Sequence, residues 1–254
     1  MNDKYKRALD KSYFAKELWN LSRPMNALQQ GIATNHEPFL MVLAARQIFG
    51  KTTITALTEA LHPMIYIPNF KVLVATDKLK TSQEFLDKVV YFWDIFKEKD
   101  WPENRLEACI NNTTEFTLSN GSRILALSGE QKSPKGLTAD VLIMDETAYI
   151  DDTYIQLALP TMASRPNARL IALSTPNGKQ GWFYREWLKG NKKIFSTWQD
   201  CDWRDKEYFE GLKTQMTDRT FRQEFECEFL EMESAALPAE LIEKAVTDEF
   251  EAWN

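Results

Sequence analysis

FLMVLAARQIFGKTT, residues 39–53, joins an apolar run directly to a loop that ends in Gly50, Lys51 and Thr52. A continuous apolar run of this length predicts a strand buried on both faces, as in a parallel sheet. The loop nearly matches the phosphate-binding pattern G-x-x-x-x-G-K-[ST], with Ala45 where the first glycine belongs. Because Ala45 needs only a backbone conformation open to alanine, the deviation weakens the pattern match more than the chemistry.

The residues after the loop predict a helix, since Ile54, Leu57 and Leu61 recur at spacings of three and four until His62-Pro63. Strand, glycine loop and helix are the context of a phosphate site, where backbone N–H groups and the helix N-terminus hold phosphates. The lysine of such a loop reaches the β and γ phosphates, and its hydroxyl residue binds Mg²⁺. The loop alone leaves open a second interpretation, a solvated lysine after a turn.

The composition is that of a soluble globular chain able to bury a sizeable core: 254 residues, 44% hydrophobic and 27% charged. No apolar run reaches the roughly 18 residues of a membrane span, and the N-terminus lacks a signal-peptide core. We therefore expect an intracellular protein with no membrane contact. Three scattered cysteines and two histidines argue against a disulfide framework or a histidine-rich zinc site. The net charge of -6 argues against nucleic-acid binding by bulk charge, so any such contact must be local.

Further strands and helices alternate along the chain. Apolar runs predict buried strands at 72–76, 141–145 and 168–174, and a helix follows the first of them, with Thr81 and Glu84 as a capping box. Asn120-Gly121 joins EFTLS to SRILALS in a hairpin. The sequence therefore predicts an α/β fold whose mainly parallel central sheet is flanked by helices and carries a β-hairpin. Near the end, Phe221, Phe225 and Phe229 predict the packed face of one more helix.

Two adjacent carboxylates, Asp145 and Glu146, follow the strand residues VLIM. Ligands of open α/β sheets bind at the carboxyl ends of the strands. Asp145 is expected to hold Mg²⁺ through water, and Glu146 to polarise the attacking water. The alternative is a strand end that leads into a solvated acidic loop.

A third motif, LSTPNGKQG, lies at residues 173–181, where the next strand ends. Its small hydroxyl and amide side chains, Ser174, Thr175 and Asn177, can touch a γ-phosphate or its water. A plain turn is the alternative for this segment.

Taken in order, these motifs resemble the ATPase domain of the large terminase subunit, the DNA-packaging motor of tailed bacteriophages. The resemblance covers nearly the whole chain and includes the RQ-containing GKT loop, SPKGLTADVLIMDETAYI, STPNG and FRQEFECEFLE. It implies an ASCE-type P-loop NTPase that uses ATP and Mg²⁺. It further implies a ring, usually a pentamer, on a portal protein. That ring moves double-stranded DNA into a procapsid with a small terminase subunit, in the cytoplasm of the infected bacterial host.

The resemblance also implies roles for particular residues. Catalytic roles fall to Glu146, Lys51, Arg46 and Lys135, Mg²⁺ binding to Thr52 and Asp145, and coupling to Ser174, Thr175 and Asn177. Nucleotide contacts fall to Ala45, Arg46, Gln47, Gly50, Lys51, Thr52, Thr53 and Gln30. The adenine-contacting glutamine of the family corresponds to Gln29 or Gln30.

The chain departs from the family in two places. Arg46 lies four residues before Gly50, one more than in many relatives, and Lys135-Gly136 stands where many relatives have Arg-Gly. Lysine lacks the planar fork of arginine, so Arg123 and Arg165 are further candidates for a finger acting on a neighbouring subunit.

Residues 1–235 are expected to form the ATPase domain, and 236–254 to begin a linker toward a nuclease domain that the sequence does not contain. Basic clusters at Lys78 and Lys80, or at Lys189, Lys192 and Lys193, are candidate DNA contacts. Two other functions stay open: a helicase-like ATPase on another substrate, and a nucleotide-gated ring-assembly module with little hydrolysis.

Overall fold

A single eight-stranded sheet organises the computed structural model, which describes residues 3–20, 23–129 and 134–231. The strands are β1 (Phe39–Ala44), β2 (Lys71–Thr76), β3 (Ala108–Asn111), β4 (Glu115–Leu118), β5 (Arg123–Ser128), β6 (Val141–Asp145), β7 (Arg169–Ser174) and β8 (Lys192–Ser196). Their order across the sheet is β3-β4-β5-β2-β6-β7-β1-β8. The pairs from β5 to β8 are parallel, and β3, β4 and β5 pair antiparallel. The mainly parallel sheet with a hairpin is therefore confirmed.

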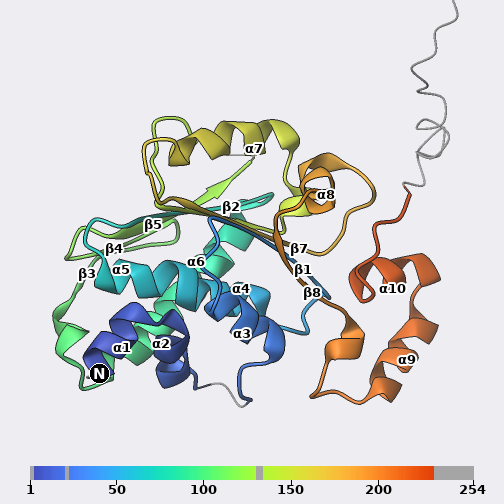
Figure 1. The fold of residues 1–254 in the computed structure, drawn as a ribbon, viewed down its shortest axis with the longest axis horizontal. Helices are drawn as coiled ribbons and strands as arrows, with labels where there is room; N and C mark the ends of the chain where they lie inside the picture. Colours follow the sequence, from blue (N-terminus) through green and yellow to red (C-terminus); the bar gives the residue numbers. More distant parts are fainter. Residues whose placement is uncertain (1–2, 21–22, 130–133, 232–254) are drawn as a thin grey trace, which may run out of the picture.

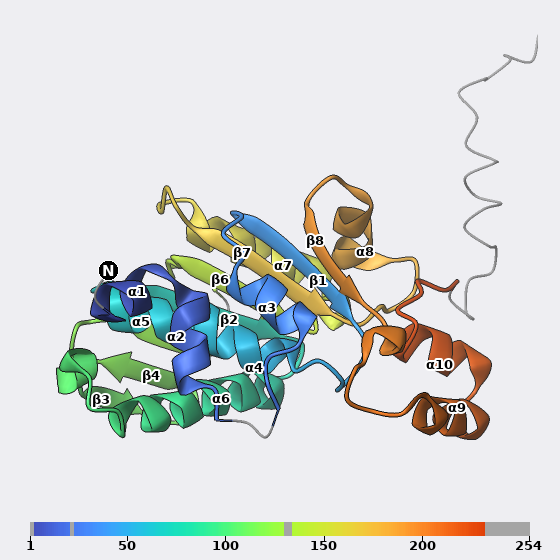
Figure 2. The same cartoon turned by 60° about the horizontal axis from the view of Figure 1, so that its bottom comes forward.

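Helices cover both faces of the sheet. On one face lie α1 (Asp3–Leu9), α2 (Lys11–Leu18), α3 (Ala27–Ala33), α4 (Lys51–Thr55), α5 (His62–Tyr66) and α6 (Leu79–Lys97), and on the other lie α7 (Asp152–Ala158) and α8 (Gly181–Leu188) (Figure 1). Two short helices, α9 (Lys206–Gln215) and α10 (Asp218–Glu224), sit beside the sheet next to β8 (Figures 1 and 2). Because the central strands are covered on both sides, they are continuous apolar runs, such as the buried β6.

The strand order brings the predicted motifs together. β7 lies between β1, which leads into the glycine loop, and β6, which ends in the acidic pair. This inserted strand is the arrangement expected of an ASCE-type P-loop fold. In register, Asp145 on β6 lies opposite Leu173 on β7, and Leu43 on β1 lies opposite Ser174. All three motifs therefore open at one edge of the sheet.

The helix after the glycine loop is longer than the sequence predicted. It does not stop near His62-Pro63 but continues through a π-helical segment, Ala56–Leu61, into α5 and ends at Tyr66. Proline has no N–H to donate and its ring crowds the preceding turn, and the wider π turn ahead of Pro63 gives it room.

Other local expectations also needed correction. The helix over α6 begins at Leu79, so Thr81 lies inside its first turn and makes no capping box with Glu84. At the chain's other end α10 stops at Glu224, and Phe229 packs on Phe183 and Tyr184 instead of extending the helix. The edge strands β3 and β8 were not expected. Both are largely exposed, so neither carries the apolar run that identifies a buried strand.

Candidate functional site

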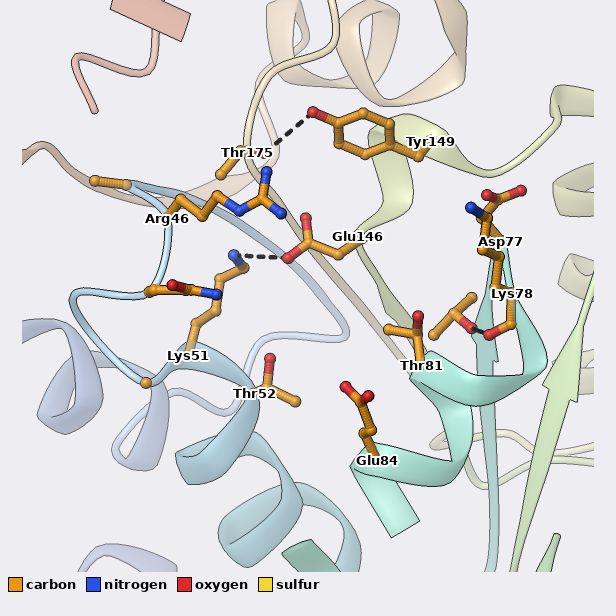
Figure 3. Close-up of a pocket in the computed structure, with 14 residues that line it drawn as sticks. Arg46, Lys51, Thr52, Asp77, Lys78, Thr81, Glu84, Glu146, Tyr149 and Thr175 are labelled. Carbon is orange, nitrogen blue, oxygen red and sulfur yellow. Dashed lines mark hydrogen bonds and ion pairs between the residues drawn. The ribbon is translucent and has the colours of Figure 1, made fainter. Parts of the chain in front are cut away.

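A cavity of about 460 Å³ opens where the carboxyl ends of β1, β2, β6 and β7 meet (Figure 3). This is where ligands of open α/β sheets bind. Its lining residues are Ala45, Arg46, Gln47, Gly50, Lys51, Thr52, Thr76, Asp77, Lys78, Thr81, Glu84, Glu146, Tyr149 and Thr175. Most of the residues predicted from the glycine loop, and one of the acidic pair, therefore share one cavity.

The lysine of the loop faces the predicted catalytic carboxylate. Lys51 Nζ lies 3.1 Å from Glu146 Oε1, and the lysine side chain is only 8% exposed (Figure 3). A buried ammonium needs a charged partner, and Glu146 provides one in this structure. Glu146 itself adopts a left-handed backbone conformation with φ 51°, which is rare for a residue with a side chain. Such backbone geometry is concentrated at functional sites.

The hydroxyl and carboxylate predicted to hold the metal are also in contact. Thr52 Oγ1 donates to Asp145 Oδ2 at 2.8 Å, and the Glu146 N–H donates to Asp145 Oδ1 at 3.1 Å. Burial and the neighbouring Glu146 charge raise the pKa of Asp145 to about 6. A desolvated carboxylate beside a hydroxyl is a hard oxygen pair that suits Mg²⁺, so these residues fit the ion.

Within the described ranges, no three His, Cys, Asp or Glu side chains gather into a metal cluster. This agrees with the way proteins usually bind Mg²⁺, through one or two carboxylates completed by substrate phosphates and water.

The backbone of the loop explains how alanine replaces the first glycine. Gly50 adopts φ 58° and Gln47 φ 56°, both left-handed, whereas Ala45 has no such conformation. Ala45 instead extends the pairing of β1, with its N–H donating to the Ser196 carbonyl at 3.0 Å. At Gly50 a Cβ would come 3.0 Å from Gln29 Nε2, so glycine is required there and not at Ala45.

Arg46 connects the loop to the C-terminal helices. Its N–H donates to the Glu224 carbonyl at 2.9 Å, and its guanidinium lies 3.5 Å from the Glu224 carboxylate. The guanidinium is exposed and points toward Glu146 across the mouth of the cavity (Figure 3). Glu224, on α10, carries no recognisable motif, and the sequence analysis missed it.

The predicted coupling segment holds the loop that follows the acidic pair. Ser174 Oγ accepts from the Ala148 N–H at 3.0 Å, and Asn177 Nδ2 donates to the Ala148 carbonyl at 3.1 Å. Thr175 lines the cavity, 3.5 Å from the hydroxyl of Tyr149. Two polar side chains therefore hold the backbone of one residue shortly after Glu146.

A second cavity, of about 570 Å³, lies on the other side of the glycine loop. Its walls are Trp19, Arg23, Pro24, Met25, Asn26, Gln29, Gln47, Ile48, Phe49, Gly50, Thr53, Asp202 and Trp203. Gln29 is buried and accepts from the Asn26 N–H at 2.9 Å. Gln30 is exposed, donates to the Met25 carbonyl at 2.8 Å and lines neither cavity. Of the two glutamines considered for the base, Gln29 is the one beside the loop.

The remaining basic candidates are distributed differently. Lys78 lines the first cavity, opposite the loop, whereas Lys135 is exposed and lines neither cavity. Arg165 lies 3.4 Å from Asp140, and Lys189 pairs with Glu186 on its own helix. The segment 236–254, expected to begin a linker, lies outside the described residues. In the part of the chain that is described, no helix combines the length and the apolar character of a membrane span.

Comparison with known proteins places this geometry in a family. The profile of the family described as terminase large subunit, T4likevirus-type, N-terminal, matches residues 41–244. A comparison with curated protein sequences gives no match.

Among solved structures, the fold is similar to a point mutant of the large terminase ATPase domain of Thermus phage P74-26. The TM-score is 0.73 at 18% identity, over 90% of this chain and 99% of that one. It is also similar to the large terminase of a thermophilic bacteriophage, with a TM-score of 0.66 at 14% identity over 82% and 54%. For the HK97 bacteriophage large terminase the values are 0.62 and 16% over 85% and 50%. The chain thus spans the ATPase domain but about half of the two full large terminases.

The family profile covers well over half of the chain, and the solved structures share its P-loop fold. The chain belongs to the family of N-terminal domains of T4-like terminase large subunits.

Proposed function

We propose that the chain is the ATP-hydrolysing motor domain of a viral terminase large subunit, which translocates double-stranded DNA into a procapsid. The observation that supports this most is the pairing of Lys51 with Glu146 and of Thr52 with Asp145 at one cavity. The large terminase of the thermophilic bacteriophage has been solved in complex with ADP and with ATP-gamma-S, which supports a nucleotide as ligand here.

The loop residues would bind the phosphates. Backbone N–H groups at the start of α4 and the ammonium of Lys51 offer positive charge to the β and γ phosphates. Because Lys51 pairs with Glu146 here, phosphate binding competes for the ammonium and frees the Glu146 carboxylate. Thr52 and Asp145 would hold Mg²⁺, which supplies charge neutralisation at the phosphate oxygens.

Glu146 is then placed to orient and polarise the attacking water. The guanidinium of Arg46, exposed above it, would stabilise charge on the transferred phosphoryl group. Ser174 and Asn177 hold the backbone of Ala148, so a displacement of the Glu146 loop is transmitted to the segment after β7. This supports a coupling role for that segment.

The partners follow from the proposed motor. They are double-stranded DNA, the portal protein, the small terminase subunit and further copies of the chain in a ring, of which the pentamer is our proposal. The site of action is the cytoplasm of the infected bacterial host. Family membership supports these proposals.

The experiment is ATP turnover by the purified chain over a range of protein concentrations, with Glu146→Gln and Lys51→Ala as variants. Loss of a positioned general base typically lowers turnover by roughly 10²- to 10⁴-fold, so Glu146→Gln should bind ATP but lose hydrolysis. Lys51→Ala should lose phosphate binding.

Specific activity that rises with protein concentration would support a ring in which neighbours complete the site. Tight ATP binding without turnover at any concentration would contradict the hydrolytic motor and favour a nucleotide-gated assembly module. Full turnover in Glu146→Gln would show that another group positions the water.

A further inference from the structure

The two cavities form one continuous trough over the glycine loop. Gln47 and Gly50 line both of them, so a ligand whose phosphates lie beside Lys51 extends past Gly50 into the second cavity. The second cavity, of about 570 Å³, lies within the range of small-molecule sites. The proposed mechanism uses only the first cavity.

The second cavity has the chemistry of a site for a flat aromatic group. Its walls are rich in apolar and aromatic residues, with polar groups at a few places, among them the Asn26 and Gln29 amides and the Asp202 carboxylate. Such a combination recognises a nucleobase, whose faces are apolar and whose edges carry donors and acceptors.

A stacked pair forms one part of this wall. The guanidinium of Arg23 lies 3.9 Å from the ring centroid of Trp203, closer than the other cation–ring contacts in the described residues. Arg23 is fixed from behind, because the Trp19 indole donates to its carbonyl at 2.7 Å and Trp19 stacks on Phe92. The pair thus joins the segment before α3 to the segment before α9.

We propose that the Arg23–Trp203 pair packs against the nucleobase of the bound nucleotide. Guanidinium and indole planes are both surfaces on which bases stack. The proposal rests on the proposed function, since it extends the same nucleotide beyond its phosphates. Gln29 then lies between the two ends of the trough, with its Nε2 beside Gly50.

Arg204 offers a matched control. Its guanidinium also lies over the Trp203 ring, at 5.1 Å, and over Tyr208 at 4.2 Å, but it lines neither cavity. It therefore tests whether any change at this cation–aromatic cluster affects the ligand, or only a change in the cavity wall.

The test is calorimetric titration of the full chain with ADP and, separately, inorganic pyrophosphate, both with Mg²⁺. Stacking of one base on an aromatic side chain corresponds to about tenfold or more in affinity, so Trp203→Ala and Arg23→Ala should weaken ADP binding by that amount. Pyrophosphate binding should be unchanged in both variants. Trp203→Phe should recover most of the ADP affinity, and Arg204→Ala should bind both probes as the unmodified chain does.

Two results would overturn the proposal: ADP affinity that is unaltered in Trp203→Ala, or equal losses for ADP and pyrophosphate, which would show that the pair merely supports the fold. Failure of the proposed function looks different. In that case the unmodified chain binds neither probe, or Lys51→Ala binds pyrophosphate normally, whatever Trp203 does.

Discussion

His62 should make the stability of this protein fall with acidification by a calculable amount. The side chain stands at the far end of the helix that begins at the glycine loop, between the rings of Phe14 and Tyr66, each with its centroid 5.1 Å away. Its Nε2 lies 2.8 Å from the Arg7 carbonyl, so the neutral ring donates there. Burial lowers the pKa of His62 from 6.5 to about 4.

The sign follows from which state binds the proton. Between the two pKa values of His62 the unfolded chain takes up a proton that the folded chain does not bind, so acidification stabilises the unfolded state. With values of 6.5 and about 4, the linkage relation gives a loss of about 2 kcal/mol between about pH 8 and about pH 5. The contribution is fully present above pH 6.5 and is lost as the pH falls toward 4.

The assay is urea unfolding, followed by circular dichroism at several pH values, of the unmodified chain and of His62→Gln. Glutamine keeps an amide donor for the Arg7 carbonyl but does not titrate. Other titrating groups, such as Asp145, are shared by both proteins and cancel in the difference. The unmodified chain should lose about 2 kcal/mol more than His62→Gln, and the exposed His36→Gln should retain that loss. Parallel pH profiles for the unmodified chain and His62→Gln would refute the reasoning.

Two further substitutions test the supports of the site. Glu59 is 2% exposed and pairs with the ammonium of Lys11 and the guanidinium of Arg169, so Glu59→Gln should leave buried cations unpaired and lower the free energy of unfolding by about 3–5 kcal/mol. Urea unfolding measures this, and a loss under about 1 kcal/mol would contradict the buried network. Ser174→Ala removes the acceptor of the Ala148 N–H, which should cost about 1–3 kcal/mol in unfolding and lower ATP turnover more than ADP affinity. Unchanged turnover in a folded variant would argue against coupling through that contact.

The sequence predicted the fold where the signal is local. The buried strands β1, β2, β6 and β7 are continuous apolar runs, and burial on both faces leaves each of them that signature. The edge strands β3 and β8 escaped prediction because exposure removes it. The helix past Pro63 escaped because a π turn has no recognisable pattern in single residues.

The site divides in the same way. Gly50, Lys51, Thr52 and the acidic pair are recognisable because phosphate and metal chemistry fixes residue types at short spacings along one turn. A sequence cannot show which side chain shares a cavity with them, because that depends on strand order and on how distant segments pack. The structure decided that Gln29 rather than Gln30 lies beside the loop, and that Glu224 holds Arg46.

The sequence by itself therefore determined the chemistry of this protein, a phosphate loop and two carboxylates on buried parallel strands. Only the tertiary structure decided what surrounds that chemistry. Arg23 and Trp203 meet across most of the chain, in a contact that no local spacing encodes. Local backbone geometry sets the phosphate site, whereas long-range packing sets the wall proposed here for the base.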